Sequence, residues 1–243
     1  MRTRKTTIWI MVSMFFPLGL PVVQATVVLN DGGIHTLNWT INDGVNIKNS
    51  PLNYPTTLNL VTGGWIKYWL YVYDSSQANI SGGRIDWFLN ASNNSLVRIS
   101  GGLISGVLST QDDSYVDISD GLIGAYLQVC QNSHVSISGG SLGSDLYTFD
   151  SSQLDISGGT IGGSLITNEY SQITIYGSGF NHPYGILTGT GLLTGILANG
   201  DLISNHFQTY SYSRIILVPE PTMLLLLGLG AVIVGKKRYE QTP

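Results

Sequence analysis

The most regular feature of the hydrophobic pattern is a short unit that recurs every 19 residues along the middle of the chain. It reads Ile-Ser-Gly-Gly, or Ile-Ser-Asp-Gly in the third copy, and the copies begin at Ile80, Ile99, Ile118, Ile137 and Ile156. Val61-Thr62-Gly63-Gly64 extends the series upstream, and Ile175-Tyr176-Gly177 extends it downstream. A fixed period of this length is typical of repeat architectures.

Aligning the repeats on that Ile, as position one, shows further columns. Position ten is Leu in Leu70, Leu89, Leu108, Leu127, Leu146 and Leu165. Position six is Ile or Leu, position sixteen is always Ser, and position eighteen is Ala, Val, Leu or Ile. The resulting Ser-x-Val-x-Ile alternation predicts a strand, and no helical stripe is present. We expect two or three short strands per repeat, broken by the Gly-Gly corner and by an Asp- and Asn-rich corner near position fourteen.

A single 19-residue unit is too small to bury its own apolar side. Wound as one coil, it stacks Ile on Ile and Leu on Leu at the inter-strand spacing of about 4.8 Å, and its neighbours satisfy its backbone groups. We therefore predict an all-β fold, a single-stranded parallel β-helix with its repeats in residues 61–180. A β-propeller is the alternative, but 19 residues are too few for its four-stranded blade.

Both ends of a β-helix expose strand edges that are usually covered. Residues 26–60 are predicted as an N-terminal cap, because Pro51 and Pro55 interrupt strand pairing there. Residues 181–217 are predicted as a C-terminal cap built from Gly-rich short strands.

The start of the chain has the form of a secretory signal. Three basic residues within the first five positions precede an apolar run over residues 8–20, and Ala25 fits the small residue before a cleavage site. We predict that residues 1–25 are a signal peptide and that the mature chain starts near Thr26. The alternative is an uncleaved anchor, although the run is shorter than the ~20 apolar residues of a membrane span.

The other end is a three-part tail over residues 218–243. The tripeptide Pro219-Glu220-Pro221 is followed by an apolar stretch, predicted as a transmembrane helix over residues 222–235, and by the basic residues Lys236, Lys237 and Arg238. Basic residues beyond a span hold that end in the cytoplasm, which agrees with a signal peptide that exports the body. Such a helix covers roughly 21 Å of a ~30 Å hydrocarbon core, so it suits a transient anchor better than a permanent one.

This order of tripeptide, apolar helix and basic stop resembles the PEP-CTERM sorting tail. The resemblance implies an exosortase-type enzyme as a partner, which recognises the Pro-Glu-Pro, cleaves the tail and replaces it with another attachment, in bacteria that often make exopolysaccharide. A plain C-terminal membrane tail is the alternative. The coil length resembles the filamentous-haemagglutinin class of secreted β-helices, which implies right-handed winding.

Between the two signals the chain is acidic. Residues 26–218 contain thirteen acidic and five basic residues, a net charge of −8, which argues against nucleic acid as a partner. Cys130 is the only cysteine, so neither an internal disulfide nor a cysteine-cluster metal site can form. We expect no cofactor and no metal.

Acid and amide side chains recur at position fourteen, as Asp74, Asn93, Asp112, Gln131, Asp150 and Glu169. Asp150 and Glu169 are expected on successive coils at about the separation of a retaining glycosidase pair, so a β-helix polysaccharide lyase or glycosidase is the alternative function. We favour a structural role and expect no catalytic residues, because Asp and Asn accept backbone N–H bonds at such corners and no Lys or Arg is near that pair. The four histidines have no ligand spacing, and the acidic run from Asp112 to Asp120 has no calcium-loop signature.

Aromatic residues gather at positions nine, eleven and thirteen, as Trp69, Tyr71, Tyr73, Phe88, Tyr126, Tyr147 and Phe149. Because Leu70 and its equivalents are expected to point inward, these rings are expected to form an outward row. Such a row can contact a glycan or a partner protein, or it can simply cover one face of the solenoid. The sequence therefore predicts an exported, envelope-anchored, non-catalytic surface or extracellular-matrix protein, a rigid rod that contacts exopolysaccharide or neighbouring proteins.

Overall fold

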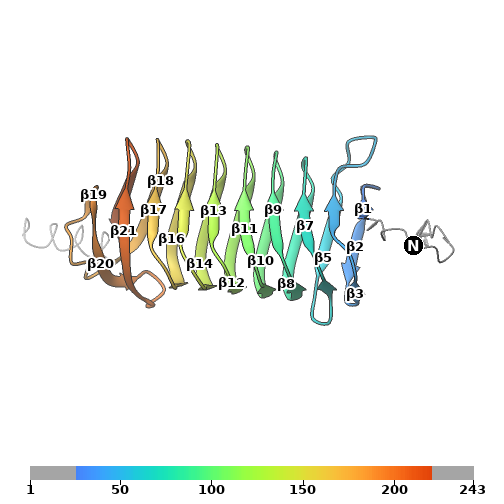
Figure 1. Ribbon diagram of the computed structural model, residues 1–243, viewed down its shortest axis with the longest axis horizontal. Helices are drawn as coiled ribbons and strands as arrows, with labels where there is room; N and C mark the ends of the chain where they lie inside the picture. Colours follow the sequence, from blue (N-terminus) through green and yellow to red (C-terminus); the bar gives the residue numbers. More distant parts are fainter. Residues whose placement is uncertain (1–25, 221–243) are drawn as a thin grey trace, which may run out of the picture.

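In the computed structural model, which describes residues 26–220, the chain winds into a right-handed β-solenoid of about eight turns with about 19 residues each. The coils lie side by side along an elongated rod, and the described chain begins at one end of the rod and leaves at the other (Figure 1). None of the described residues forms a helix, so this part of the chain offers no helical membrane span. The predicted signal peptide (1–25) and transmembrane helix (222–235) lie outside the described residues.

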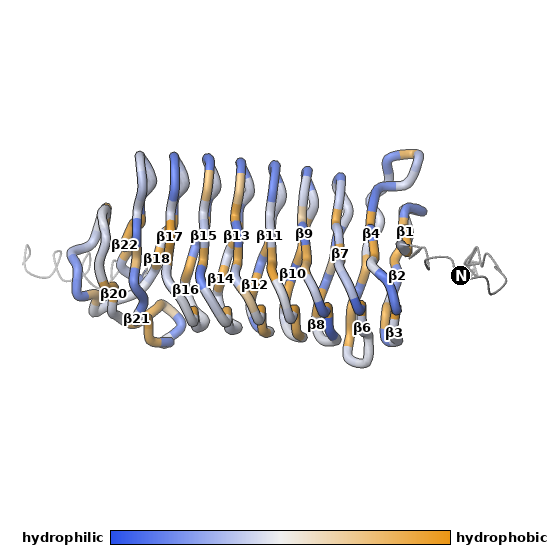
Figure 2. Tube along the Cα trace, in the orientation of Figure 1, coloured by the Kyte–Doolittle hydropathy of each residue, from blue (hydrophilic) through white to orange (hydrophobic). Residues whose placement is uncertain are grey.

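Each body coil contributes one long strand and one short strand, and each kind forms its own parallel ladder. The long-strand ladder contains β8 (Gln77–Ile85), β10 (Leu96–Ile104), β12 (Tyr115–Ile123), β14 (His134–Leu142), β16 (Gln153–Ile161) and β18 (Gln172–Ser178). The short-strand ladder contains β4 (Val45–Ile47), β7 (Trp69–Val72), β9 (Phe88–Ala91), β11 (Val107–Thr110), β13 (Leu127–Val129), β15 (Leu146–Thr148) and β17 (Leu165–Thr167). Figure 2 shows the same period as hydrophobic strand segments that alternate with hydrophilic corners.

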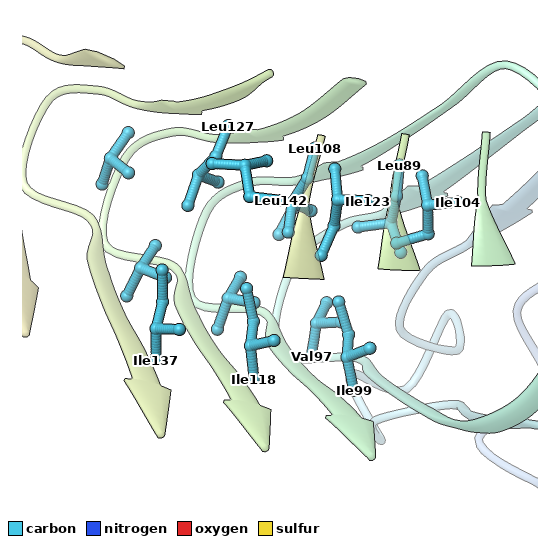
Figure 3. Packing of buried hydrophobic residues seen from close by; sticks show 14 of the residues in the cluster. Leu89, Val97, Ile99, Ile104, Leu108, Ile118, Ile123, Leu127, Ile137 and Leu142 are labelled. Carbon is cyan, nitrogen blue, oxygen red and sulfur yellow. The ribbon is translucent and has the colours of Figure 1, made fainter. Parts of the chain in front are cut away.

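The apolar columns lie inside the rod. Ile99 pairs with Ile80 on one side and with Ile118 on the other, and all five isoleucines of this column are at most 6% exposed. Figure 3 shows Ile99, Ile118 and Ile137 on one wall, facing Leu89, Leu108 and Leu127 on the opposite wall. Since burying one such side chain stabilises a fold by about 1.5–3 kcal/mol, the stacked columns are a main source of stability.

The prediction that the Gly-Gly corner breaks the strand was wrong. The long strands run through it and bend, with a register shift at the glycines. Gly102 has a φ of +90°, and a Cβ there would lie 2.6 Å from the carbonyl oxygen of Gly82 in the preceding coil. Glycine therefore permits the bend without ending the pairing. The strand breaks lie instead at positions seven and eight and near position fourteen.

At the upstream end of the repeat region, the strand register differs by one residue from the alignment of the sequence repeats. Leu60 pairs with Ile80 and is fully buried, whereas Val61, which the tetrapeptide suggests as the partner, is only half-buried. The amide of Gly64 donates to the carbonyl of Val61 at 2.9 Å, in a turn that holds the extra residue.

Residues 26–60, for which an N-terminal cap is predicted, already contain parallel-paired strands. Here β1 (Val27–Leu29) pairs with β4, and β2 (Ile34–Leu37) pairs with β5 (Thr57–Leu60). The two-residue strand β3 (Thr40–Ile41) pairs with β6 (Trp65–Ile66). A cleft of about 470 Å³ opens at this end of the rod, lined mainly by Val27, Leu29, Ile34, Leu37, Trp39, Ile41 and Leu58. The segment predicted as a cap thus continues the solenoid.

The opposite end contains antiparallel strands, within the region predicted as a C-terminal cap. β21 (Leu202–Thr209) continues the short-strand ladder from β17, and β22 (Arg214–Pro219) continues the long-strand ladder from β18. The intervening chain forms β19 (Gly185–Leu187) and β20 (Thr190–Leu197), which pair antiparallel with β22 and β21 respectively. These two strands cover the last edge of each ladder.

Candidate contact surface and sorting motif

The strand β7 displays aromatic rings on the outside of the rod. Leu70 and Val72 are fully buried, so the intervening side chains of Trp69, Tyr71 and Tyr73 point away from the core and are half-buried against one another. The ring centroids of Tyr71 and Tyr73 lie 5.4 Å apart in a stacked arrangement. The outward orientation agrees with the alternation in the sequence.

These rings belong to a larger group, which we call the first aromatic cluster: Tyr68, Trp69, Tyr71, Tyr73, Trp87 and Phe88. Phe88 stacks on Trp69 at 6.3 Å and meets Tyr71 edge-on at 5.3 Å. Tyr68 and Trp87 contact each other in a T-shaped arrangement, with their ring centroids 4.9 Å apart. Column alignment does not indicate these two residues, because they lie at the corner beside position nine.

Glycine makes room for this cluster. A Cβ on Gly44, in the preceding coil, would lie 2.2 Å from Cε2 of Trp69, so the indole ring packs directly over that glycine. The indole is therefore supported from beneath, which restricts its rotamers and preorganises the surface.

A second aromatic cluster, Tyr126, Tyr147 and Phe149, lies further along the same columns. The rings of Tyr126 and Tyr147 are 5.7 Å apart, and those of Tyr147 and Phe149 are 6.2 Å apart. With Gln128 they line a shallow cleft of about 310 Å³. The coil between the two clusters carries no aromatic residue in these columns. The continuous outward row that the sequence predicts is therefore divided into two separate clusters.

Polar groups modify both clusters. The hydroxyl of Tyr147 donates to Asp145 at 3.0 Å, and this bond is the main reason why the pKa of Tyr147 is raised. Burial, followed by the nearby Tyr71, raises the pKa of Tyr73. Both phenols therefore stay protonated at neutral pH, and the O–H proton of Tyr147 is already donated to Asp145.

Three basic side chains lie over aromatic rings in or next to the coils that carry the first cluster. The Nζ atom of Lys48 lies 5.2 Å from the ring centroid of Tyr73. Lys67 and Arg84 lie over the ring of Trp65, at 5.0 and 5.5 Å. Of the five basic residues in 26–218, Lys48 thus lies over a ring of the first aromatic cluster, whereas Lys67 and Arg84 lie over Trp65, outside that cluster. Arg84 also forms an ion pair with Asp86.

The acid and amide column at position fourteen forms a structural ladder. All six residues have positive φ, between 56° and 61°. Each side chain accepts a hydrogen bond from the backbone N–H of the equivalent corner one coil earlier, as Glu169 does from Asp150 at 2.8 Å. The carboxylates of Asp150 and Glu169 are thus both engaged with backbone. Within residues 26–220, no group of three or more potential metal-binding side chains comes together.

Two histidines have acidic partners that their spacing did not reveal. His134 contacts Asp155 of the next coil at 3.0 Å, and His35 contacts Asp31 at 2.8 Å. Cys130 is half-buried beside Gln128, and its burial raises the pKa of the thiol.

The chain reaches the tripeptide while it is still paired with the solenoid. Val218 lies beside Tyr176 and Pro219 beside Gly177, in parallel register. Pro219 is the last residue of β22 and lies two residues beyond Leu217, where the pairing of β22 with β19 ends. Pro221 and the basic residues Lys236, Lys237 and Arg238 lie outside the described residues.

Residues 217–238 match the family model of the PEP-CTERM protein-sorting motif. This PEP-CTERM signal indicates an exported protein that is anchored in the membrane and processed by an exosortase-type enzyme at the cell surface. No curated protein and no solved structure gives a significant match to the chain. The PEP-CTERM match covers only the tail, so the role of the rod rests on its own geometry.

Proposed function

We propose that this chain is a non-catalytic surface or matrix protein, a rod that is sorted by its PEP-CTERM tail and contacts exopolysaccharide through its aromatic clusters. The observation that carries the proposal is the preorganised first aromatic cluster, whose rings face outward beside Lys48. Flat rings stack on the apolar faces of sugars, and cations beside them favour sugars with carboxylate or sulfate groups.

Two clusters on one rod suit a repeating polymer. An aromatic contact is worth about 0.5–1.5 kcal/mol beyond area burial, so a single ring holds a sugar weakly. The first and second clusters occupy the same columns on different coils, so one extended glycan chain can engage both, with a gain in avidity.

A non-catalytic role is supported by the position-fourteen ladder. A glycosidase needs one carboxylic acid that donates a proton and a second carboxylate that attacks or activates water. Asp150 and Glu169 instead accept backbone N–H bonds from the corners of the preceding coils, so both carboxylates already serve the ladder. Release of oligosaccharides from acidic or neutral exopolysaccharides by the purified protein would contradict this part of the proposal.

The binding test compares two sets of exposed rings. Replacing Trp69, Tyr71 and Tyr73 together with Ser should lower retention on the producer's exopolysaccharide about ten-fold or more, with an unchanged β-sheet circular dichroism spectrum. The control replaces Tyr170 and Tyr212, a stacked pair 69% and 75% exposed, and should bind like wild type. Equal retention of both variants would show that the first aromatic cluster only covers the coil beneath it.

A further inference from the structure

The exposed aliphatic side chains concentrate at the ends of the rod. The described residues include eight large aliphatic side chains classed as exposed, and only Leu122 belongs to the body coils. Three lie near the N-terminal end, and four lie in the antiparallel strands at the C-terminal end. We call these four the cap rim: Ile186 (66% exposed), Leu192 (43%), Ile196 (42%) and Leu202 (75%).

Three cap-rim residues lie on the last strands of the two ladders, and Leu202 lies one strand further in, on β21. Ile186 is on β19, outside β22, and Leu192 and Ile196 are on β20, outside β21. Leu202 lies directly opposite Ile196 across the hairpin of β20 and β21. β21 lies at the level of β18, β20 lies one strand further out, and β19 lies one strand beyond that. Because adjacent strands are about 4.8 Å apart, the four side chains span about two strand spacings, roughly 10 Å, along the rod axis.

The membrane tail leaves from this same end. β22 ends at Pro219, and the apolar stretch begins at residue 222. Two intervening residues span at most about 7 Å when fully extended. Insertion of the tail must therefore bring the C-terminal end of the rod to within about 10 Å of the membrane surface.

Charge does not oppose this approach. Residues 179–220 contain only Asp201, Arg214 and Glu220 as charged side chains at neutral pH. Asp201 accepts hydrogen bonds from the backbone N–H of Gly159 and the side chain of Asn199, so its charge is already solvated by protein.

We propose that the cap rim is a membrane-contact surface, on which the rod stands upright while its tail is inserted. The partner is a lipid surface: the four aliphatic side chains enter the boundary between headgroups and acyl chains, a region about 5–10 Å deep. Headgroup water at that depth still hydrogen-bonds the outer backbone edges of β19 and β20. This contact fixes the height of the Pro-Glu-Pro tripeptide above the bilayer. The proposal of a membrane contact rests on the sorting role proposed for the tail.

The first test measures membrane depth along the rod in the full chain, inserted through its tail into vesicles of phosphatidylethanolamine and phosphatidylglycerol. Single cysteines are introduced in a Cys130→Ser background as Leu202→Cys, Leu122→Cys and Val28→Cys, and each is labelled with an environment-sensitive fluorophore. A nitroxide-labelled lipid should quench the fluorophore at position 202 at least two-fold more than those at 122 and 28. Equal quenching at 202 and 122 would overturn the proposal.

The second test follows tail removal in producing cells. Changing all four cap-rim residues to Ser should slow the removal several-fold without affecting export. A matched control changes Val28, Ile34 and Leu52, at the far end, to Ser and should be processed at the normal rate. Normal processing of the cap-rim variant would show that the contact does not position the tripeptide. If the wild-type tail is never removed, the sorting proposal fails, while the quenching pattern still tests the membrane contact.

Discussion

The carboxylate of Asp150 accepts a hydrogen bond from the backbone N–H of Gln131, the equivalent corner residue of the preceding coil, at 2.9 Å. Asp150 itself has a φ of 58°, a left-handed conformation that Asn and Asp tolerate better than most residues. The same side chain therefore shapes its own corner and links it to the one before.

Substitutions at Asp150 should separate these two effects. Asp150→Asn should retain nearly full stability, because its amide oxygen still accepts the bond. Asp150→Gly loses the hydrogen bond but fits the left-handed backbone. Asp150→Ala loses the hydrogen bond and also fits the left-handed backbone poorly, so it should lower the free energy of unfolding by about 1–2 kcal/mol. Urea denaturation of the three variants checks the order. An Ala variant as stable as the Asn variant would show that the ladder is incidental.

A charge in the isoleucine column should be far more damaging. Ile99→Asp places an unpaired carboxylate between Ile80 and Ile118, with an expected loss of about 3–5 kcal/mol. Because each coil is stabilised by its neighbours, several coils should unfold together. Thermal melting followed by circular dichroism provides the measurement. Ser100→Asp, on the outward face beside Ile99, is the control and should melt close to wild type.

The C-terminal strands should show an acid-sensitive contribution from Asp201. Hydrogen bonds from Asn199 and from the backbone of Gly159 lower the pKa of Asp201. The stabilisation is therefore fully present above the ordinary Asp pKa of about 4 and is lost as the pH falls through the lowered value. Asp201→Asn should be less stable than wild type by about 1 kcal/mol at pH 7, with the difference shrinking towards pH 2. A difference that stays constant with pH would contradict this assignment.

The sorting motif can be tested independently of the rod. Changing Pro219, Glu220 and Pro221 together to Ala should leave export intact but leave the tail attached and the protein in the membrane. Mass spectrometry of the native C-terminus detects the difference. Changing Pro51 and Pro55 to Ala provides a control with intact processing. Wild-type cleavage of the triple variant would show that the tripeptide is not the recognised element.

The body coils were predictable because one pattern is repeated with little variation. An inward Ile or Leu at a constant interval leaves one register in which all the columns are buried, and Leu70 through Leu165 occupy that register. The C-terminal end was less predictable. β21 carries the inward alternation of Ile203, Asn205 and Phe207, but an inserted segment separates it from the coil that it continues.

The polar interior was not predictable from hydrophobicity. Ser133 and Ser171, at position sixteen, are fully buried, and their hydroxyls bond those of Thr110 and Thr148 at 2.7 and 2.8 Å. Serine is usually exposed, so its residue type gives no sign of burial, although the Ser-x-Val-x-Ile alternation puts it on the same side as the inward Val and Ile. Serines of this column are also buried where position twelve is not threonine: the hydroxyls of Ser114 and Ser152 donate to the backbone carbonyls of Ala91 and Val129, which only the fold brings near.

The aromatic surface was predicted in part. Alternation with Leu70 correctly placed Trp69 on the outside, because strand geometry fixes that side. It did not indicate Gly44 beneath the indole or Trp87 beside it, because both contacts join different coils.

The parallel register of the body also bears on how such a protein can change over generations. Each coil delivers the chain to the same point of the cross-section, displaced by one strand spacing. An in-frame duplication or deletion of one repeat would therefore change the length of the molecule by about 4.8 Å and leave both of its ends as they are. The distance between the envelope and the far tip is thus a heritable quantity that the gain or loss of whole repeats can adjust in equal steps.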